Sequence, residues 1–424
     1  MPLEELPPQP PPPRIKVLHV ITKFWAGAGG NTLVSALGMD PRRYEVWVAA
    51  CEGGDLWARA EAAGIRTVKL RRFRDHISPL EDLGVLAQLV ALIRRERFSI
   101  VHTHSAKGGF LGRLAAWGCG TPVIVHTTHG PSFHEFMSPA RRKLYIGLDR
   151  LARPMTDRFL DVAPSVVRQA VETRIARPGS IAVVPSAVEM DGIPAESDPS
   201  VRPELGLPPG APVVGTVGRL DFQKAPLDFV RMAAVVARTR PDARFVMVGD
   251  GELADQARAE AARLGVDVLF TFTGFRPDAA RIASAFDVFV VSSLYEGLGR
   301  SLTEALASGR PVAATAVNGV PDLIEHGATG LLAPPRDPEA LARCVLWLLE
   351  HPHEARQMGL IGRNQVRELF DPARMCELLD REYRRLLGLP EPPGSAAAGT
   401  ERAPAVELAA AVSGNGMARS RDAV

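Results

Sequence analysis

The sequence has few of the features that mark exported, membrane-spanning or zinc-stabilised proteins. Its 424 residues include only four cysteines and no Cys-x-x-Cys pair, which argues against a disulfide framework or a zinc site. No run approaches the roughly 18 apolar residues that cross a bilayer. The proline-rich residues 1–13 lack the basic and apolar regions of a signal peptide. These absences lead us to expect a cytoplasmic protein.

A strong net charge is also missing, because 50 Lys and Arg nearly balance 48 Asp and Glu to give +2. The balance is uneven along the chain: residues 14–190 hold 25 Lys and Arg against 15 Asp and Glu, whereas residues 191–424 hold 25 against 31. The basic first half suggests an anionic substrate or surface, although a solvated basic face without a partner explains the excess equally well. We expect no nucleic-acid partner.

The length and the alternation of elements predict two α/β domains. A chain of 424 residues is too long for one ordinary core. Short apolar runs alternate with segments of helical period, which indicates parallel strands that are buried on both faces. The pattern is that of two doubly wound, Rossmann-like domains. The runs occupy residues 15–21, 45–51, 66–70, 100–105, 122–128, 159–163, 181–185, 212–217, 243–249, 268–274, 288–293, 311–317 and 330–333.

Breaks in this pattern predict the domain boundaries. An Asp followed by Pro372 predicts the start of a closing helix, which we expect to pack back on the first domain. The two ends of the chain are poor in aromatic residues and are expected to be disordered. The predicted parts are a tail over 1–13, a first domain over 14–190, a linker over 191–210, a second domain over 211–369, the closing helix over 370–387 and a tail over 388–424.

The most informative motif is a pair of glutamates, Glu296 and Glu304, which follows the predicted strand at 288–293. Glycines between them should open a helix near Gly299, where free N–H groups and the positive helix end would attract a diphosphate. Each carboxylate can accept two hydrogen bonds from a vicinal diol. The pair therefore suits a diphosphate that carries sugars. The alternative is a loop glutamate and a surface helix glutamate without a ligand.

A second motif, Gly218-Arg219 with Lys224, supplies positive charge at the end of another predicted strand. Arg can bind two phosphate oxygens at once and Lys adds a compact charge, so the two side chains could neutralise a departing diphosphate. The sequence contains no Asp-x-Asp pair, which fits a site without a metal. The alternative is that this Arg and this Lys are ordinary surface residues.

Glycine-rich turns follow two further predicted strands. Gly249 lies in a strand-turn-helix step in which Asp250 is expected to cap the helix. Gly29 and Gly30 lie in a segment whose backbone could approach a diphosphate or an acceptor. That segment is similar to a dinucleotide-binding fingerprint, but Thr32 replaces its third glycine.

Histidines gather at predicted strand ends in the first domain. His102 and His104 alternate along one strand and would share a face, so at least one of them is expected in the core. His129, which stands just past its strand, should be the most accessible, and Lys107 follows the strand of His104. No His-Glu-x-x-His or comparable spacing supports a metal cluster.

Residues 138–153 mix basic and apolar side chains at helical spacing. Such a helix could lie on the anionic inner face of the cytoplasmic membrane. A domain helix with a solvated basic face is the alternative.

In combination, these motifs resemble the retaining GT-B glycosyltransferases known as family 4. The resemblance implies two Rossmann-like domains that face each other across a cleft. The His-x-His-Ser-x-Lys and Thr-His-Gly patterns look most like bacterial members that build surface polysaccharides on lipid-linked acceptors. The resemblance covers about residues 14–387 and rests on Gly218-Arg219…Lys224, Gly249-Asp-Gly-Glu252, the two glutamates with seven residues between them, Ala-Ser-Gly309-Arg-Pro-Val and Gly330-Leu-Leu-Ala-Pro-Pro-Arg-Asp337.

The resemblance also implies how the donor, a UDP- or GDP-sugar, would be held. Glu296 would contact hydroxyls of the donor sugar, and Glu304 would contact the ribose. Arg219 and Lys224 would bind the diphosphate. Further donor contacts would come from Gly29, Gly30, Gly218, Gly249, Gly297, Leu298, Gly299, Arg300 and Ser301.

On the acceptor side, the resemblance places His129 near the reacting carbon, and we add His104 and Lys107 to that face. The family needs no metal or other cofactor. Its proposed reaction is a front-face transfer in which the leaving phosphate helps to deprotonate the acceptor. We therefore expect a retaining, metal-independent glycosyltransferase of cell-surface polysaccharide or glycolipid synthesis, with a saccharide or polyprenyl-linked acceptor.

Two positions depart from the family pattern and leave the donor open. Ser186-Ala187 stands where Asn-Gly is common, and Asn318-Gly-Val-Pro-Asp322 stands where Gly-Gly…Glu is usual. Two other functions are weighed against glycosyl transfer. One is a nucleotide-dependent oxidoreductase, prompted by the first glycine segment and by Glu52 some 20 residues beyond it. The other is a non-catalytic nucleotide-sugar-binding protein that keeps the fold.

Overall fold

A computed structural model describes residues 13–51, 54–74, 76–130 and 132–390. These residues form two compact units that interleave along the chain. The predicted tails lie almost wholly outside the described residues, and the predicted domain boundaries stay a prediction. Among the described residues, unit 1 draws on 13–127, Ala152–Arg158 and 379–390, and unit 2 draws on Thr128–Leu151 and Phe159–Leu378.

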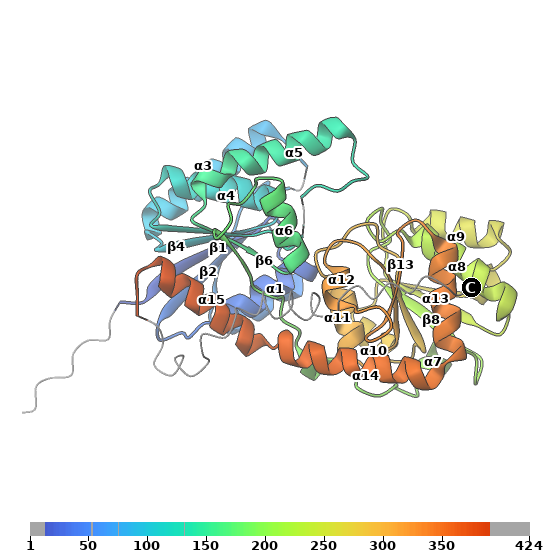
Figure 1. Ribbon diagram of the computed structural model, residues 1–424. Helices are drawn as coiled ribbons and strands as arrows, with labels where there is room; N and C mark the ends of the chain where they lie inside the picture. Colours follow the sequence, from blue (N-terminus) through green and yellow to red (C-terminus); the bar gives the residue numbers. More distant parts are fainter. Residues whose placement is uncertain (1–12, 52–53, 75, 131, 391–424) are drawn as a thin grey trace, which may run out of the picture. The chain divides into compact units, whose positions relative to one another are not determined.

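The predicted architecture of two doubly wound sheets is confirmed, because each apolar run forms a strand in one of two parallel sheets (Figure 1). The first sheet has the order β3-β2-β1-β4-β5-β6-β7. The chain runs outward from β1 to β3 and restarts with β4 on the other side of β1, which makes a topological switch point between β1 and β4. The strands are β1 (Ile15–Val20), β2 (Tyr44–Ala50), β3 (Arg66–Lys69), β4 (Ile100–His104), β5 (Val123–Thr127), β6 (Arg158–Asp161) and β7 (Ile181–Val183).

The two faces of the first sheet differ in character. Leu18 lies on the face that packs against helices α3 (Pro79–Glu96) and α4 (Ala106–Gly118) in an apolar core. Alternation along β1 places His19 on the opposite face, where the parallel register sets it beside His102 of β4. The other helices that follow these strands are α1 (Ala26–Leu37), α2 (Gly54–Ala62), α5 (Pro139–Ala152) and α6 (Pro164–Glu172), with a 3₁₀ turn η1 (Arg153–Met155).

The second sheet has the order β10-β9-β8-β11-β12-β13, so its switch point lies between β8 and β11. Ligands of doubly wound sheets bind beyond the carboxyl ends of the strands at such a point. The strand order of the second sheet therefore predicts that a donor site lies beyond the carboxyl ends of β8 and β11. The strands are β8 (Val213–Val217), β9 (Arg244–Val248), β10 (Phe270–Gly274), β11 (Val288–Val291), β12 (Val312–Thr315) and β13 (Leu331–Ala333).

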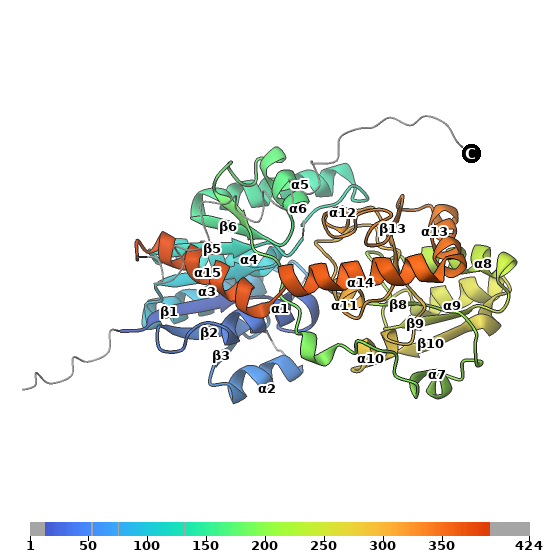
Figure 2. The same cartoon turned by 60° about the horizontal axis from the view of Figure 1, so that its bottom comes forward.

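Helices cover both faces of the second sheet, as the continuous apolar strands require. Helices α8 and α13 lie side by side on one face (Figures 1 and 2), where they share a core with α9. The other face packs against α10, α11 and α14. These helices are α8 (Pro226–Thr239), α9 (Ala254–Arg263), α10 (Ala279–Ala283), α11 (Arg300–Ala307), α13 (Pro338–Glu350) and α14 (Pro352–Leu369). Shorter elements are α7 (Val201–Glu204), α12 (Val320–Leu323), η2 (Met190–Gly192) and η3 (Asp267–Leu269).

The predicted closing helix is α15 (Pro372–Leu386), and its predicted Asp cap is confirmed. Asp371 Oδ1 accepts a hydrogen bond from the N–H of Arg374 at 3.0 Å. The second half of α15 belongs to unit 1. There the fully buried Tyr383 places its hydroxyl 2.6 Å from Nδ1 of His102, so the end of the described chain is hydrogen-bonded to the first sheet.

Candidate active site

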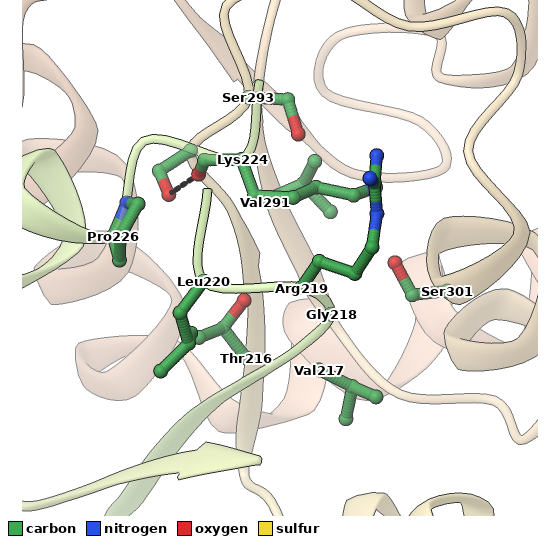
Figure 3. Close-up of a pocket in the computed structure, with 11 residues that line it drawn as sticks. Thr216, Val217, Gly218, Arg219, Leu220, Lys224, Pro226, Val291, Ser293 and Ser301 are labelled. Carbon is green, nitrogen blue, oxygen red and sulfur yellow. Dashed lines mark hydrogen bonds between the residues drawn. The ribbon is translucent and has the colours of Figure 1, made fainter. Parts of the chain in front are cut away.

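A pocket lies beyond the carboxyl ends of β8 and β11, at the switch point of the second sheet. Figure 3 shows Arg219, Lys224, Ser293 and Ser301 around it. The hydroxyl of Ser292 donates to the carbonyl of Lys224 at 2.9 Å. The sequence predicted four of the residues in this wall: Gly218, Arg219, Lys224 and Ser301. The full lining is Thr216, Val217, Gly218, Arg219, Leu220, Lys224, Pro226, Val291, Ser292, Ser293 and Ser301.

Glu296 lies behind this wall and is bound to it through two side chains. Lys224 Nζ is 2.5 Å from Glu296 Oε1, and the hydroxyl of Ser293 donates to the same oxygen at 2.8 Å. Gln223 Nε2 approaches the second oxygen, Oε2, at 3.4 Å. A carboxylate that accepts from an ammonium and a hydroxyl is held in one orientation. Glu296 and the basic motif, which were predicted to bind one donor, therefore lie side by side in the structure.

Arg219 lies at the open side of the pocket, with 67% of its side chain exposed. Its two terminal nitrogens are 3.0 Å from Asp221 Oδ2 and 3.0 Å from Gln223 Oε1. Gln223 thus touches both the arginine and Glu296, and its Nε2 also donates to the carbonyl of Tyr295 at 3.1 Å. The guanidinium is aimed by two side chains and still faces solvent, as a group that binds phosphate oxygens needs to be.

The predicted helix start is confirmed, since α11 begins at Arg300 directly after Gly299, whose φ is +83°. Glu304 lies in the second turn and lines a second pocket. Arg300 Nε is 2.7 Å from Glu304 Oε1. Ser301 lines both pockets, so the two pockets adjoin at the helix start.

Three glycines allow the loop of Glu296 to meet two other loops of unit 2 without a side chain between them. A Cβ on Gly297 would lie 2.3 Å from the carbonyl oxygen of His129, and one on Gly319 would lie 1.8 Å from the carbonyl oxygen of Gly297. The Cα of Gly130 packs against Gly297 in the same way. His129 and the loop of Glu296 are therefore in backbone contact, as expected of residues predicted to serve one site.

His129 itself is half-buried, with a left-handed φ of +52°. Burial lowers the pKa of its imidazole to about 4, so the ring is neutral near pH 7. The other strand-end histidines of the motif are more deeply buried, with His102 and His104 exposed by 2% and 1%. His129 is thus more accessible than these two, although it is not an exposed side chain.

The predicted acceptor-side residues His104 and Lys107 are already engaged inside unit 1. His104 Nε2 is 2.9 Å from Nδ1 of His19. The ammonium of Lys107 forms an ion pair with Asp82 and donates to the carbonyl of His76 at 2.6 Å. Their predicted contact with an acceptor stays a prediction.

Sequence spacing gave no sign that His19 joins His102 and His104, because the three are brought together by strand pairing. Their candidate ligand nitrogens all lie within 4.8 Å of one another. The two ring nitrogens of His102 are hydrogen-bonded to Tyr383 at 2.6 Å and to Thr127 at 2.7 Å. In this structure the group is a buried hydrogen-bonded network.

Gly29 and Gly30 lie in the first turns of α1, where a Cβ on Gly29 would lie 2.9 Å from the backbone of Phe24. Their contact with the donor stays a prediction. The predicted helix cap at Asp250 was wrong. Asp250 does not cap α9, which begins at Ala254, but accepts from the N–H of Gly251. Glu52 lies outside the described residues.

Gly249 is a packing position, because a Cβ there would lie 1.8 Å from the carbonyl oxygen of Gly218. Three residues of the site were not predicted from the sequence. They are Gln223, Ser293 and Asn318, whose Oδ1 accepts from the N–H of Glu296 at 3.1 Å. Only the position of Asn318 was noted, as a departure from a family pattern.

Comparison with known proteins agrees with this geometry. Residues 211–351 match the family model described as Glycosyl transferases group 1, and residues 26–187 match Glycosyl transferase 4-like domain. The chain is 32% identical to the UDP-Gal:alpha-D-GlcNAc-diphosphoundecaprenol alpha-1,3-galactosyltransferase of Escherichia coli, over 75% of this chain and 84% of that relative. It is 40% identical to the 2-deoxystreptamine N-acetyl-D-glucosaminyltransferase of Streptomyces fradiae, over 68% and 73%.

Solved structures share the fold at lower identity. The structure of Anabaena HepE in complex with UDP and glucose has a TM-score of 0.75 at 19% identity, over 88% of this chain and 100% of that one. The sucrose-phosphate synthase of Thermosynechococcus elongatus has a TM-score of 0.74 at 22% identity, again over 88% and 100%. Both agree with the two-sheet architecture described above.

Proposed function

Because the chain belongs to the family 4-like glycosyltransferases, which have the GT-B fold, we propose that it transfers a sugar from a UDP- or GDP-sugar to a saccharide or polyprenyl-linked acceptor. The product would enter cell-surface polysaccharide or glycolipid synthesis. Membership of this family argues against both alternatives, the oxidoreductase and the non-catalytic nucleotide-sugar-binding protein.

The observation that carries the proposal is the joining of Lys224 and Glu296 beside the pocket that Arg219 borders. A donor needs cations at its diphosphate and hydrogen-bond acceptors at its sugar hydroxyls. Arg219 and Lys224 supply the cations, and Glu296 supplies the acceptor within 2.5 Å of one of them. Glu304, which lines the adjoining pocket, would bind the ribose.

The proposed reaction retains the anomeric configuration. The bond between the anomeric carbon and the diphosphate oxygen breaks, and the acceptor oxygen bonds to the same carbon from the same face. The acceptor proton passes to the leaving diphosphate oxygen, whose charge Arg219 and Lys224 stabilise. His129, neutral near pH 7 because burial lowers its pKa, would donate or accept a hydrogen bond at the reacting carbon's substituents.

We also propose that this reaction requires no metal. The support is the absence of an Asp-x-Asp pair from the sequence and the presence of two side-chain cations at the pocket. Turnover should survive chelation by EDTA. A requirement for added Mg²⁺ or Mn²⁺ after chelation would contradict this part of the proposal.

The acceptor side of the proposal rests on the E. coli relative, whose printed name specifies a diphosphoundecaprenol-linked sugar. A lipid-linked acceptor would bring this enzyme to the inner face of the cytoplasmic membrane. Helix α5 could bind that surface, because it carries Arg141, Arg142 and Lys143 with the exposed Leu144 and Leu151. No helix in the described part of the chain is long and apolar enough to cross a membrane.

Release of nucleoside diphosphate from UDP- and GDP-sugars tests the proposed function. Changing Arg219 and Lys224 together to Ala should lower turnover by at least roughly 10²–10³, the effect of one lost transition-state charge contact. Arg263→Ala is the matched control, because Arg263 is an exposed arginine of α9 that is ion-paired to Glu260. Donor turnover that the double change leaves intact would remove the assignment.

A further inference from the structure

Four rings of unit 2 gather beside the Lys224–Glu296 pair: His134, Phe136, Phe222 and Tyr295. His134 and Tyr295 stack with 3.9 Å between ring centroids and only 6° between ring planes. Phe222 lies 6.1 Å from His134 and 6.4 Å, edge to face, from Phe136. These separations are those of favourable aromatic pairs. The rings therefore form one cluster.

Two positive charges could weaken the packing of these rings: a protonated His134 and the guanidinium of Arg336. Neither of them does so. Burial, and then the positive charge of Arg141, lower the pKa of His134, so its imidazole stacks as a neutral ring near pH 7. The guanidinium of Arg336 lies 4.1 Å from the ring centre of Phe136, where a cation is attracted to the ring face. The cluster thus keeps an apolar surface with a cation at its far ring.

Two rings of this cluster are close in the sequence to the residues proposed to bind the donor. Tyr295 directly precedes Glu296, and Phe222 lies between Arg219 and Lys224. Gln223 joins the two loops by donating to the carbonyl of Tyr295 at 3.1 Å. Among the described residues that line the two donor pockets, none is a ring of this cluster. The cluster is thus next to Lys224 and Glu296 but outside the proposed donor site.

Phe222 is the accessible member. Its side chain is 43% exposed, whereas the other three rings are half-buried. A large apolar side chain that stays exposed beside a polar site offers a surface for a ligand. A pyranose ring has an apolar face of C–H groups that fits against such a ring, while its hydroxyls point sideways to hydrogen-bonding groups.

We propose that Phe222, supported by the stacked His134–Tyr295 pair, is the platform on which the acceptor sugar rests. The inference deepens the proposed function, on which it rests for the identity of the reaction. An acceptor that attacks from the face of the leaving group must approach beside Lys224, which is where Phe222 lies. The proposed donor pockets are lined by none of the four rings, so the platform would select acceptors.

Phe222→Ala tests the platform by separating acceptor from donor. The acceptor KM should rise about tenfold, the loss of one ring-stacking contact together with its buried area, with α-D-GlcNAc-diphosphoundecaprenol as the acceptor probe. Hydrolysis of the nucleotide sugar without acceptor should keep its kcat and KM, because water needs no platform. Phe222→Tyr should behave as the wild type. Phe275→Ala is the matched control, since Phe275 is a 77% exposed phenylalanine beyond β10.

Binding of methyl N-acetyl-α-D-glucosaminide, followed by saturation-transfer NMR, tests the same surface without turnover. Saturation should pass from aromatic protons to the sugar in the wild type and fall at least about threefold in Phe222→Ala, because the main contact ring is gone. A protein that binds the glycoside in this way but turns over no nucleotide sugar would overturn the proposed function and uphold the platform. An active enzyme whose acceptor KM and NMR signal are unchanged by Phe222→Ala would overturn the platform alone.

Discussion

The ammonium nitrogen of Lys224 lies 2.5 Å from Oε1 of Glu296, so the residue proposed to bind the diphosphate and the residue proposed to bind the sugar are ion-paired with each other. Their side chains are 20% and 5% exposed. Shielding from water makes such a pair stronger than a surface pair and makes the loss of either partner costly. A bound diphosphate would share the ammonium with this carboxylate.

Replacing Lys224 with Ala should therefore harm both folding and activity. The carboxylate of Glu296 would stay buried without its cation, so the free energy of unfolding should fall by about 3 kcal/mol. Donor turnover should fall by roughly 10²–10³. Urea unfolding and release of nucleoside diphosphate measure the two effects.

The double variant Lys224→Ala/Glu296→Gln separates the two roles of this pair. An amide needs no counter-ion, so most of the lost stability should return while turnover stays low. Recovery of turnover together with stability would show that Lys224 serves the fold and not the donor.

Gln223 should act as a positioning residue through Arg219 and Glu296, with which it forms contacts of 3.0 and 3.4 Å. Gln223→Glu places a second negative charge beside Glu296 and should raise the donor KM about tenfold, whereas Gln223→Met, which removes the amide but keeps the length, should mainly lower kcat. A role in packing alone would leave both constants near wild type in the well-folded Met variant, and that result would contradict the prediction.

His129 should titrate well below the ordinary range of histidine. Burial lowers its pKa to about 4 from a usual value near 6.5, so between these values the unfolded state binds the proton and the folded state does not. Its contribution to stability is therefore complete above pH 6.5 and is lost as the pH falls toward 4. ¹⁵N-edited NMR of the imidazole, assigned with His129→Gln, would measure the midpoint. A midpoint near 6.5 would show that the ring is solvated.

Gly249 should tolerate no side chain. Its φ is +135°, and a Cβ would lie 1.8 Å from the carbonyl oxygen of Gly218, so Gly249→Ala should lower the free energy of unfolding by more than about 2 kcal/mol. Gly147→Ala is the control, because Gly147 is a helical glycine with no neighbour within 4 Å of a Cβ. That change should raise stability by about 0.5–1 kcal/mol. Equal melting temperatures for the two variants would contradict the packing argument.

The strands, the helix that begins after Gly299 and the basic motif before Lys224 were predictable because each depends on short segments of chain. Buried parallel strands need continuous apolar runs. The turn from a strand into a helix needs a residue such as glycine, which adopts a positive φ without steric strain. The same local reading failed at Asp250, which was expected to cap the next helix. That helix, α9, begins only at Ala254, and the Asp250 carboxylate accepts from the N–H of Gly251 instead.

Sequence reasoning missed Gln223 and Ser293 for a related reason. Polar residues are common in every loop, so neither residue stands out in the sequence. The contact of Gln223 with Glu296 arises only when β8 and β11 pair, whereas Ser293 reaches Glu296 within one loop. The buried network of His19, His102 and His104 is a further case, because it needs the register of two strands. Motif rules based on sequence spacing do not detect residues that are brought together by the pairing of distant strands.

Along the chain, composition and periodicity were enough to specify two parallel α/β sheets and the residue types that a nucleotide-sugar site needs, since these follow from which segments must be buried and which carry charge. The meeting of Lys224 with Glu296, 72 positions further on, depends on the reversal of strand order between β8 and β11. The same reversal brings Phe222 and Tyr295 into one ring cluster with His134. Short segments of the sequence supply the charged and polar residues of this site. The distances between them are set only when loops that are far apart in the chain meet at one edge of the sheet.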